Sequence, residues 1–238
     1  MPSSTIVGKS TAAFVLARLQ SETPLRLIVD VGPGLGSYKR LIGPLLPGTR
    51  WVAIEVWAPY VGAYGLSDLY DRVYVSDVTC FDFSLLPPGG LVILGDVLEH
   101  IERNDAIATV SKIMHHMDYA ILSVPAGHWP QGEHGGNRYE AHVDSWSLPE
   151  LQSAFRPWLA GYANHTLNST QSIANLFLAN SPERRAKLAT HVAEALALHR
   201  EKPSFANCDL PFYPDLANDK VIDQFVSVMR QTIGEHAK

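Results

Sequence analysis

Three side chains that can bind a metal ion or move a proton lie close together in the middle of the chain. Asp96, Glu99 and His100 stand at positions i, i+3 and i+4, and on a helical turn residues at these separations share one face. Carboxylates and imidazoles are ligands for divalent ions, and His142 is a candidate fourth ligand. The spacing is therefore compatible with a divalent metal site formed by Asp96, Glu99, His100 and His142.

The same residues allow two interpretations without a metal. In the first, His142 or His100 acts as a general base toward an acceptor hydroxyl, because an imidazole titrates near neutral pH, and Asp96 belongs to the same catalytic group. In the second, Glu99 and His100 only cap the next helix and support a pocket. The spacing gives the three interpretations equal weight.

A glycine-rich turn follows a short apolar run near the N-terminus. Asp30 begins the sequence Asp-Val-Gly-Pro-Gly-Leu-Gly, which contains Gly32, Gly34 and Gly36. Glycine adopts positive φ and lets the backbone approach a ligand closely. Nicotinamide dinucleotide sites use G-x-G-x-x-G, but the position of the third glycine in that fingerprint is Ser37 here. The spacing therefore argues against a nicotinamide cofactor.

The elements that must position these residues alternate along the chain. Branched apolar runs at 25–31, 51–55, 72–75, 91–94 and 119–124 predict strands, and 11–20, 37–46, 57–66 and 106–117 predict helices. Such alternation predicts an α/β fold with a mostly parallel, doubly wound sheet of the Rossmann-like type. Ligands bind at the carboxyl ends of the strands in such sheets, and the glycine turn and the later acidic residues all follow strand ends.

The second half of the chain predicts the remaining parts of the fold. Residues 125–144 form a long loop, and two runs at 161–167 and 173–178 predict a terminal antiparallel hairpin. Helices are expected at about 181–200 and 221–233, with a loop rich in proline and aromatic residues at 203–214 between them. We therefore expect a Rossmann-like domain over 1–180 and a C-terminal helical extension over 181–238 that packs on it.

These motifs resemble the class I S-adenosylmethionine-dependent methyltransferases over about residues 25 to 158. The resemblance implies that S-adenosylmethionine is the cofactor and that the glycine turn wraps its methionine and ribose parts. It places Asp30 near the methionine ammonium and Glu55 on the ribose hydroxyls, where two carboxylate oxygens suit a vicinal diol. Adenine would lie at Asp77 and Val78, with Asp82 as the competing acid. The implied cofactor-binding set is Asp30, Gly32, Gly34, Gly36, Glu55, Asp77, Val78 and Asp96.

The segment from Asp96 to His100 resembles the D-V-L-E-H stretch of the same superfamily, which lines the sulfonium end of the cofactor. Members that methylate vicinal diols, among them ubiquinone-pathway and small-RNA 2′-O-methyltransferases, bind a metal with E-x-x-E-H, from which this chain departs by having Asp96 first. The resemblance implies methyl transfer, and the histidine and aromatic content of 127–137 favours a small hydroxylated molecule or saccharide as the oxygen acceptor. RNA 2′-O-methylation and a non-catalytic cofactor-binding module are the alternatives.

The composition restricts the partners. The chain of 238 residues has 19 basic and 24 acidic residues, a net charge of −5, which argues against a nucleic-acid partner. No apolar run approaches the ~20 residues that span a bilayer, and no signal peptide is recognisable. Cys80 and Cys208 lie outside any metal-binding pattern. We expect a cytoplasmic protein with free thiols, a small-molecule acceptor, no membrane contact and a possible homo-oligomer.

Overall fold

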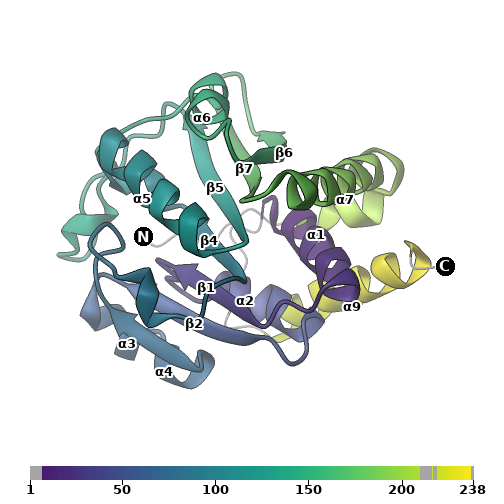
Figure 1. The fold of residues 1–238 in the computed structure, drawn as a ribbon, viewed down its shortest axis with the longest axis horizontal. Coiled ribbons are helices and arrows are strands. Elements are labelled where there is room, and N and C mark those ends of the chain that lie inside the picture. The colour runs from purple at the N-terminus through teal and green to yellow at the C-terminus, as the bar shows by residue number, and fades with distance from the viewer. Residues whose placement is uncertain (1–6, 210–215, 217–218, 237–238) are drawn as a thin grey trace.

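The computed structural model describes residues 7–209, 216 and 219–236. Figure 1 shows an α/β fold around a seven-stranded sheet of order β3-β2-β1-β4-β5-β7-β6. All neighbouring strands pair in parallel except β7, which is antiparallel to both β5 and β6. The strands are β1 (Leu27–Val31), β2 (Arg50–Glu55), β3 (Arg72–Val75), β4 (Leu91–Gly95), β5 (Tyr119–Gly127), β6 (Leu159–Thr166) and β7 (Gln171–Ala179). The predicted fold class is confirmed.

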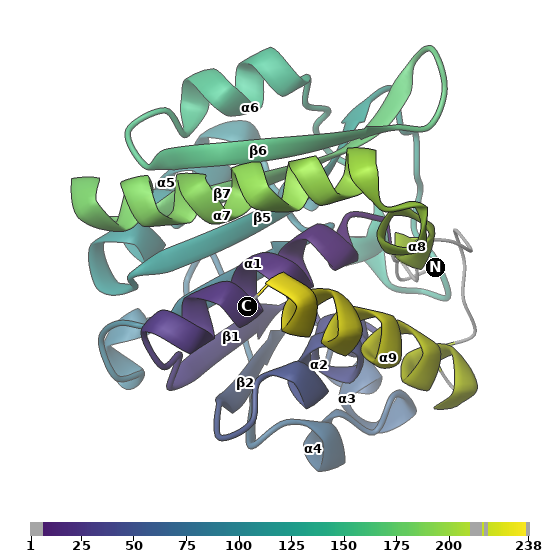
Figure 2. The same ribbon diagram turned by 90° about the vertical axis from the view of Figure 1, so that its right-hand side faces the viewer.

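Helices cover both faces of this sheet, which is why the central strands β1 and β4 are apolar at most positions. Ile28 of β1 faces one core together with Phe14 of α1, whereas the adjacent Val29 faces a second core with Val110 of α5. The first face carries α1 (Lys9–Glu22), α2 (Ser37–Ile42), α7 (Pro182–Glu201) and α9 (Asp219–His236). The second carries α5 (Arg103–His116) and α6 (Leu148–Ala154). Figure 2 shows α1, α7 and α9 side by side on the first face.

The helices of the C-terminal segment form where the sequence predicts them. Ser181 caps α7 by accepting a hydrogen bond from the Arg184 N–H, and α7 packs on α1, β6 and β7. The predicted loop at 203–214 is wrong in its first part, because α8 (Pro203–Ala206) and a 3-10 turn, η5 (Asn207–Asp209), form there. Residues 210–214 lie outside the described part of the chain.

The predicted helix at 57–66 is also different. It consists of two short helices, α3 (Ala58–Ala63) and α4 (Leu66–Leu69), because Gly65 adopts φ 62° between them. The other 3-10 turns are η1 (Gly43–Leu45), η2 (Phe83–Leu85), η3 (Leu98–His100) and η4 (Arg138–Glu140). Among the described helices, none combines the length and the apolar character needed to cross a membrane.

Candidate active site

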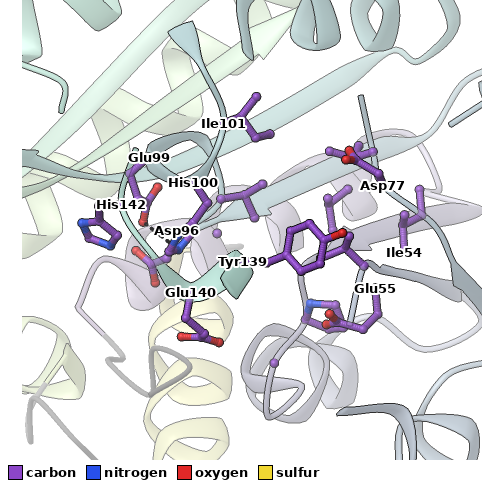
Figure 3. A pocket seen from close by; sticks show the side chains of 18 of the residues that line it. Ile54, Glu55, Asp77, Asp96, Glu99, His100, Ile101, Tyr139, Glu140 and His142 are labelled. Atoms are coloured by element: carbon purple, nitrogen blue, oxygen red, sulfur yellow. Dashed lines mark ion pairs between the residues drawn. The ribbon is translucent and has the colours of Figure 1, made fainter. Parts of the chain in front are cut away.

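The carboxyl ends of the parallel strands surround one cavity of about 680 Å³, within the ~300–1,000 Å³ that is usual for small-molecule sites. It lies where β1 and β4 are neighbours, the point at which the strand order reverses and ligands bind in such sheets. Figure 3 shows that carboxylates and imidazoles from several loops point into this space. The topology therefore brings Glu55, Asp77, Asp96 and His142 to one cavity.

Two of the three turn glycines reach the cavity. Gly32 and Gly34 line it and have φ values of 60° and 52°, a region that side chains rarely adopt. A Cβ on Gly32 would lie 2.9 Å from Cγ2 of Val97. Gly36 is absent from the lining; its Cβ would meet Leu69, so this glycine serves the packing of α2.

The structure does not bring Asp30 to the cavity. Its side chain is 1% exposed and accepts a hydrogen bond from the Tyr70 hydroxyl at 2.5 Å. Burial raises the pKa of Asp30 to about 7, an effect that the Tyr70 hydrogen bond and the charge of Lys9 partly offset. The Asp30 carboxyl thus joins β1 to Tyr70 at the end of α4. Because it does not line the cavity, it is not placed to contact a cofactor ammonium directly.

Glu55 ends β2 and lines the cavity. The Trp57 N–H donates to its Oε1 at 2.8 Å, which fixes the carboxyl at the strand end. Burial raises the pKa of Glu55 to about 7, and the charge of Glu140 adds to this effect, whereas the Trp57 N–H opposes it. A buried, oriented carboxyl of this kind is a strong acceptor for hydroxyl groups of a ligand.

Asp77 and Val78 line the far end of the cavity. Asp77 Oδ1 accepts hydrogen bonds from the N–H and the hydroxyl of Thr79, so its side chain also stabilises the turn after β3. The competing candidate, Asp82, caps η2 through the Ser84 N–H and does not line the cavity. The structure therefore favours Asp77 over Asp82.

The predicted common helical face of Asp96, Glu99 and His100 is wrong. Asp96 has φ 55° and is the one described non-glycine residue with positive φ, and the 3-10 turn begins only at Leu98. Asp96 lines the cavity, but the ligand atoms of Glu99, His100 and His142 form a group without it. Asp96 itself has the left-handed backbone conformation and precedes the turn, so its side chain does not share a helical face with Glu99 and His100.

Both histidines place their Nδ1 next to a main-chain carbonyl oxygen. His100 Nδ1 lies 3.0 Å from the carbonyl oxygen of Ala141, and His142 Nδ1 lies 2.5 Å from that of Trp129. A carbonyl only accepts, so each Nδ1 carries the proton and each Nε2 of the neutral ring is a lone-pair acceptor. The rings meet edge to face with centroids 4.8 Å apart. Burial and the neighbouring His100 lower the pKa of His142.

Glu99 completes this cluster. Its side chain is 2% exposed, its Oε2 has no hydrogen-bond partner, and its Oε1 lies 3.9 Å from His100 Nε2. Burial and the nearby Asp96 raise the pKa of Glu99 well above its ordinary value. Ligand atoms of Glu99, His100 and His142 lie within 4.8 Å of one another. A buried carboxyl group with one unpartnered oxygen, close to two imidazole rings, fits a divalent cation.

The loop from 128 to 147 folds over the cavity. The N–H groups of Val143 and Asp144 both donate to the carbonyl of Glu99, and Arg103 binds the Asp144 carboxylate with two nitrogens. Three residues before Val143, Glu140 Oε1 accepts a hydrogen bond from the Tyr60 hydroxyl of α3 at 2.9 Å. The loop is therefore tied to both walls of the site.

Comparison with known proteins gives structural matches alone: no family model and no curated protein matches the sequence. The N-terminal domain of EvdMO1 with S-adenosylhomocysteine bound aligns at a TM-score of 0.54 and 13% identity, over 71% of this chain and 80% of that one. A methyltransferase from Clostridium acetobutylicum that depends on S-adenosylmethionine aligns at 0.53 and 9%, over 73% and 92%. Magnesium protoporphyrin IX methyltransferase from Synechocystis, with bound S-adenosylmethionine, aligns at 0.51 and 15%, over 73% and 80%.

The chain has the class I methyltransferase fold. This fold accounts for the reversed β7 and for the position of the cavity, and it is the fold that the resemblance of the motifs implies. Among the cavity residues of this methyltransferase fold that were not predicted from the sequence are Lys9, Tyr60 and Glu140. Lys9 had a readable signal, because it begins a helix whose next eight residues are apolar, small or hydroxyl-bearing. Glu140 had none, since its place depends on how the loop folds back.

Proposed function

We propose that this protein is an S-adenosylmethionine-dependent methyltransferase that methylates a hydroxyl of a small hydroxylated molecule or saccharide. The observation that carries the proposal is one cavity that joins a glycine turn and a buried carboxyl, Glu55, to the imidazole pair of His100 and His142. The first two features suit a nucleoside, and the pair suits an acceptor that must lose a proton.

The cofactor would lie along the strand ends. The glycine turn would take its methionine part, Glu55 would accept hydrogen bonds from both ribose hydroxyls, and Asp77 with Val78 would contact adenine. This order follows the order of the strands from β1 to β3. The sulfonium would then face Asp96, which lines the next strand end.

The acceptor hydroxyl would lie between the sulfonium methyl and the histidines. Its oxygen attacks the methyl carbon, the carbon–sulfur bond breaks, and the hydroxyl proton passes to Nε2 of His142. The lowered pKa of His142 keeps that atom unprotonated at neutral pH, as a general base requires. In-line approach at about 3 Å is the main further requirement, because the methyl group is already electrophilic.

In the alternative to a metal-free base, the Nε2 of His142 would bind a divalent cation instead of a proton, and Glu99, His100 and His142 would hold this cation together. A bound cation supplies a Lewis acid that orients the acceptor oxygen and lowers its pKa. Support comes from the Nδ1 contacts of both histidines with main-chain carbonyls, since metal-binding histidines usually donate their other ring N–H in this way. Asp96 lies outside the group.

The cavity as a whole favours an uncharged ring as the acceptor. Its lining includes the aromatic side chains of Tyr60, Trp129 and Tyr139, whose faces pack well on ring carbons. It also includes seven carboxyls, among them those of Asp96, Glu99 and Glu140, which disfavour a polyanion such as RNA. The N-terminal domain of EvdMO1, one of the structural matches, has a crystal structure in the presence of S-adenosylhomocysteine and D-fucose.

The test is transfer of an isotope-labelled methyl group from S-adenosylmethionine to a panel of neutral sugars, catechols, sugar phosphates and short RNAs. We expect labelled methyl ethers from a neutral hydroxylated acceptor and loss of turnover by at least about 100-fold in His142→Ala. The control is His115→Ala, because His115 lies exposed on α5, away from the cavity. Transfer to RNA alone, or equal turnover in both variants, would contradict the proposal.

A further inference from the structure

One segment of the loop over the cavity contacts both of its ends. Tyr139 and Glu140 of η4 line the cavity, and so does His142, two residues further along; Figure 3 shows all three side chains at it. The charge of Glu140 contributes to the raised pKa of Glu55, so η4 lies at the Glu55 end. His142 packs against the ring of His100 at the other end. Residues 139–142 therefore form a wall that both proposed ligands would share.

Gln131 cross-links this wall from within the same loop, and it also lines the cavity. Its Nε2 donates to the main-chain carbonyl of Glu140 at 2.7 Å and lies 3.5 Å from Glu140 Oε2. Its own carbonyl accepts a hydrogen bond from the N–H of His142 at 3.0 Å, and the carbonyl of Trp129 holds the ring of His142. Gln131 thus binds Glu140 through its side chain and His142 through its main chain. A displacement of η4 therefore moves Gln131 and, with it, the main-chain contact of His142.

The end of the wall near Glu55 has two further fixed points. The Tyr60 hydroxyl donates to Glu140 Oε1. Asn137, which is 2% exposed, accepts a hydrogen bond from the N–H of Tyr139 at 3.0 Å. A nucleoside whose ribose binds Glu55 would fill the space between the end of β2 and η4 and touch residues of both. Since contacts with η4 exist only while the loop is in place, such a ligand favours the closed loop.

We propose that Gln131 is a positioning residue that couples the two halves of the site: a nucleoside bound against η4 fixes His142 for the acceptor through Gln131. The inference rests on the proposed function, since that function puts a nucleoside at Glu55. By thermodynamic linkage, a ligand that fixes His142 strengthens nucleoside binding by the same factor. The acceptor half of the site is then fully assembled only when the methyl donor is bound.

Hydrogen exchange at two main-chain amides, followed by nuclear magnetic resonance, tests this coupling. The N–H of Tyr139, which is bonded to Asn137, reports on η4. The N–H of His142, which is bonded to the carbonyl of Gln131, reports on the acceptor half. In the full chain, saturating S-adenosylhomocysteine should slow exchange at both amides about 10-fold, which is within the usual range of coupling between sites.

Gln131→Met keeps the length of the side chain and removes its N–H donors. In this variant the ligand should still slow exchange at Tyr139 about 10-fold, but at His142 by less than about 2-fold. Gln131→Lys keeps an N–H donor on a long side chain, so it should restore part of the response at His142. A defect that only destabilises the loop would not be rescued in this way.

The matched control is Gln171→Met. Gln171, on β7, also donates through Nε2 to a main-chain carbonyl of this loop, that of His128, at 3.0 Å, but it does not line the cavity. The control therefore removes the same kind of hydrogen bond from the same loop without touching the link between Glu140 and His142. It should respond to S-adenosylhomocysteine like the wild type at both amides.

Failure of the proposed function and failure of this inference give different results. If the wild type does not bind S-adenosylhomocysteine, the proposed function fails and the inference fails with it. If the wild type binds it but exchange at His142 does not change, or changes equally in Gln131→Met, the inference alone is overturned. Loss of the response at both amides in Gln131→Met, or loss of the His142 response in Gln171→Met, would assign the coupling to the loop as a whole and also overturn the role of Gln131.

Discussion

The Tyr60 hydroxyl donates a hydrogen bond to Glu140 Oε1 over 2.9 Å, and this contact joins the helix after β2 to the loop after β5. Burial raises the pKa of Tyr60 above its ordinary range, so the hydroxyl remains a donor at any physiological pH. Trp57 and Tyr139 make a second contact across the same gap, with ring centroids 6.3 Å apart. The loop and the nucleoside half of the cavity are therefore mechanically connected.

Tyr60→Phe should loosen this closure. Loss of the hydroxyl removes the donor to Glu140, which is 8% exposed and then makes one hydrogen bond fewer. We expect the free energy of unfolding to fall by about 1 kcal/mol. Hydrogen exchange of residues 128–147 should become faster while exchange of β1 and β4 stays unchanged. Tyr162→Phe, at an exposed tyrosine on β6, is the control. Unchanged loop exchange in Tyr60→Phe would show that the contact does not hold the loop.

Cofactor affinity should depend on pH through Glu55. Its pKa is about 7 in the ligand-free protein, and the ionised carboxylate is the better acceptor for ribose hydroxyls. Binding of S-adenosylhomocysteine should therefore tighten as the pH rises from about 6 to about 8, and Glu55→Gln should remove most of this dependence. Calorimetry across that range measures it. The same pH slope in Glu55→Gln and in the wild type would remove Glu55 from the ribose site.

The stability of the free protein should fall as the pH rises, in part because of Asp30. An unfolded Asp loses its proton near the ordinary value of 3.8, whereas folded Asp30 keeps it up to about 7. Between these values the folded state binds more protons, so the free energy of unfolding decreases with pH and levels off above about 7. Asp30→Asn, which still accepts from Tyr70, should flatten the fall of Tm between about pH 5 and about pH 8.

The control for this prediction is Asp82→Asn. Asp82 is exposed, and hydrogen bonds from Ser84 lower its pKa, so its contribution to stability is lost only in acid, below the pH range of the test. An Asp30→Asn profile parallel to the wild type would mean that the Asp30 carboxyl does not retain its proton in the folded state.

Metal binding should depend on Glu99, His100 and His142 and not on Asp96, the fourth ligand that the sequence suggests. In electron paramagnetic resonance titrations with Mn²⁺, Glu99→Gln and His142→Ala should each weaken binding at least about 10-fold. Asp96→Asn should stay within about 3-fold of the wild type, because Asp96 lies outside the group of converging ligand atoms. A larger loss in Asp96→Asn than in Glu99→Gln would restore the helical-face arrangement, and full activity after exhaustive chelation would favour the metal-free base.

The fold and the outline of the site could be predicted from the sequence for clear physical reasons. Buried parallel strands need continuous apolar runs, so β1, β2 and β4 could be predicted from the sequence. Ligands bind at the carboxyl ends of such strands, and this rule placed Glu55 in the same site as the glycine turn. His142 could be proposed beside His100, and the structure brings their rings to 4.8 Å.

Other features depend on geometry that a one-dimensional pattern does not encode. The positive φ of Asp96 breaks the helical register that the i, i+3, i+4 spacing suggests. The side chain of Asp30 points to the face of the sheet on which Tyr70 lies, and no spacing rule predicts Tyr70 as its partner. Glu140 enters the cavity because η4 folds the loop back on α3, and such tertiary contacts between distant segments leave no periodic signal.

A crystal structure with S-adenosylhomocysteine is the measurement that tests the central claim most directly. The account predicts the nucleoside in the cavity at the carboxyl ends of β1 to β4, with both ribose hydroxyls at hydrogen-bond distance, about 2.6–3.0 Å, from the Glu55 carboxylate. Electron density for the nucleoside elsewhere, or an empty cavity at a ligand concentration of about 1 mM, would contradict it.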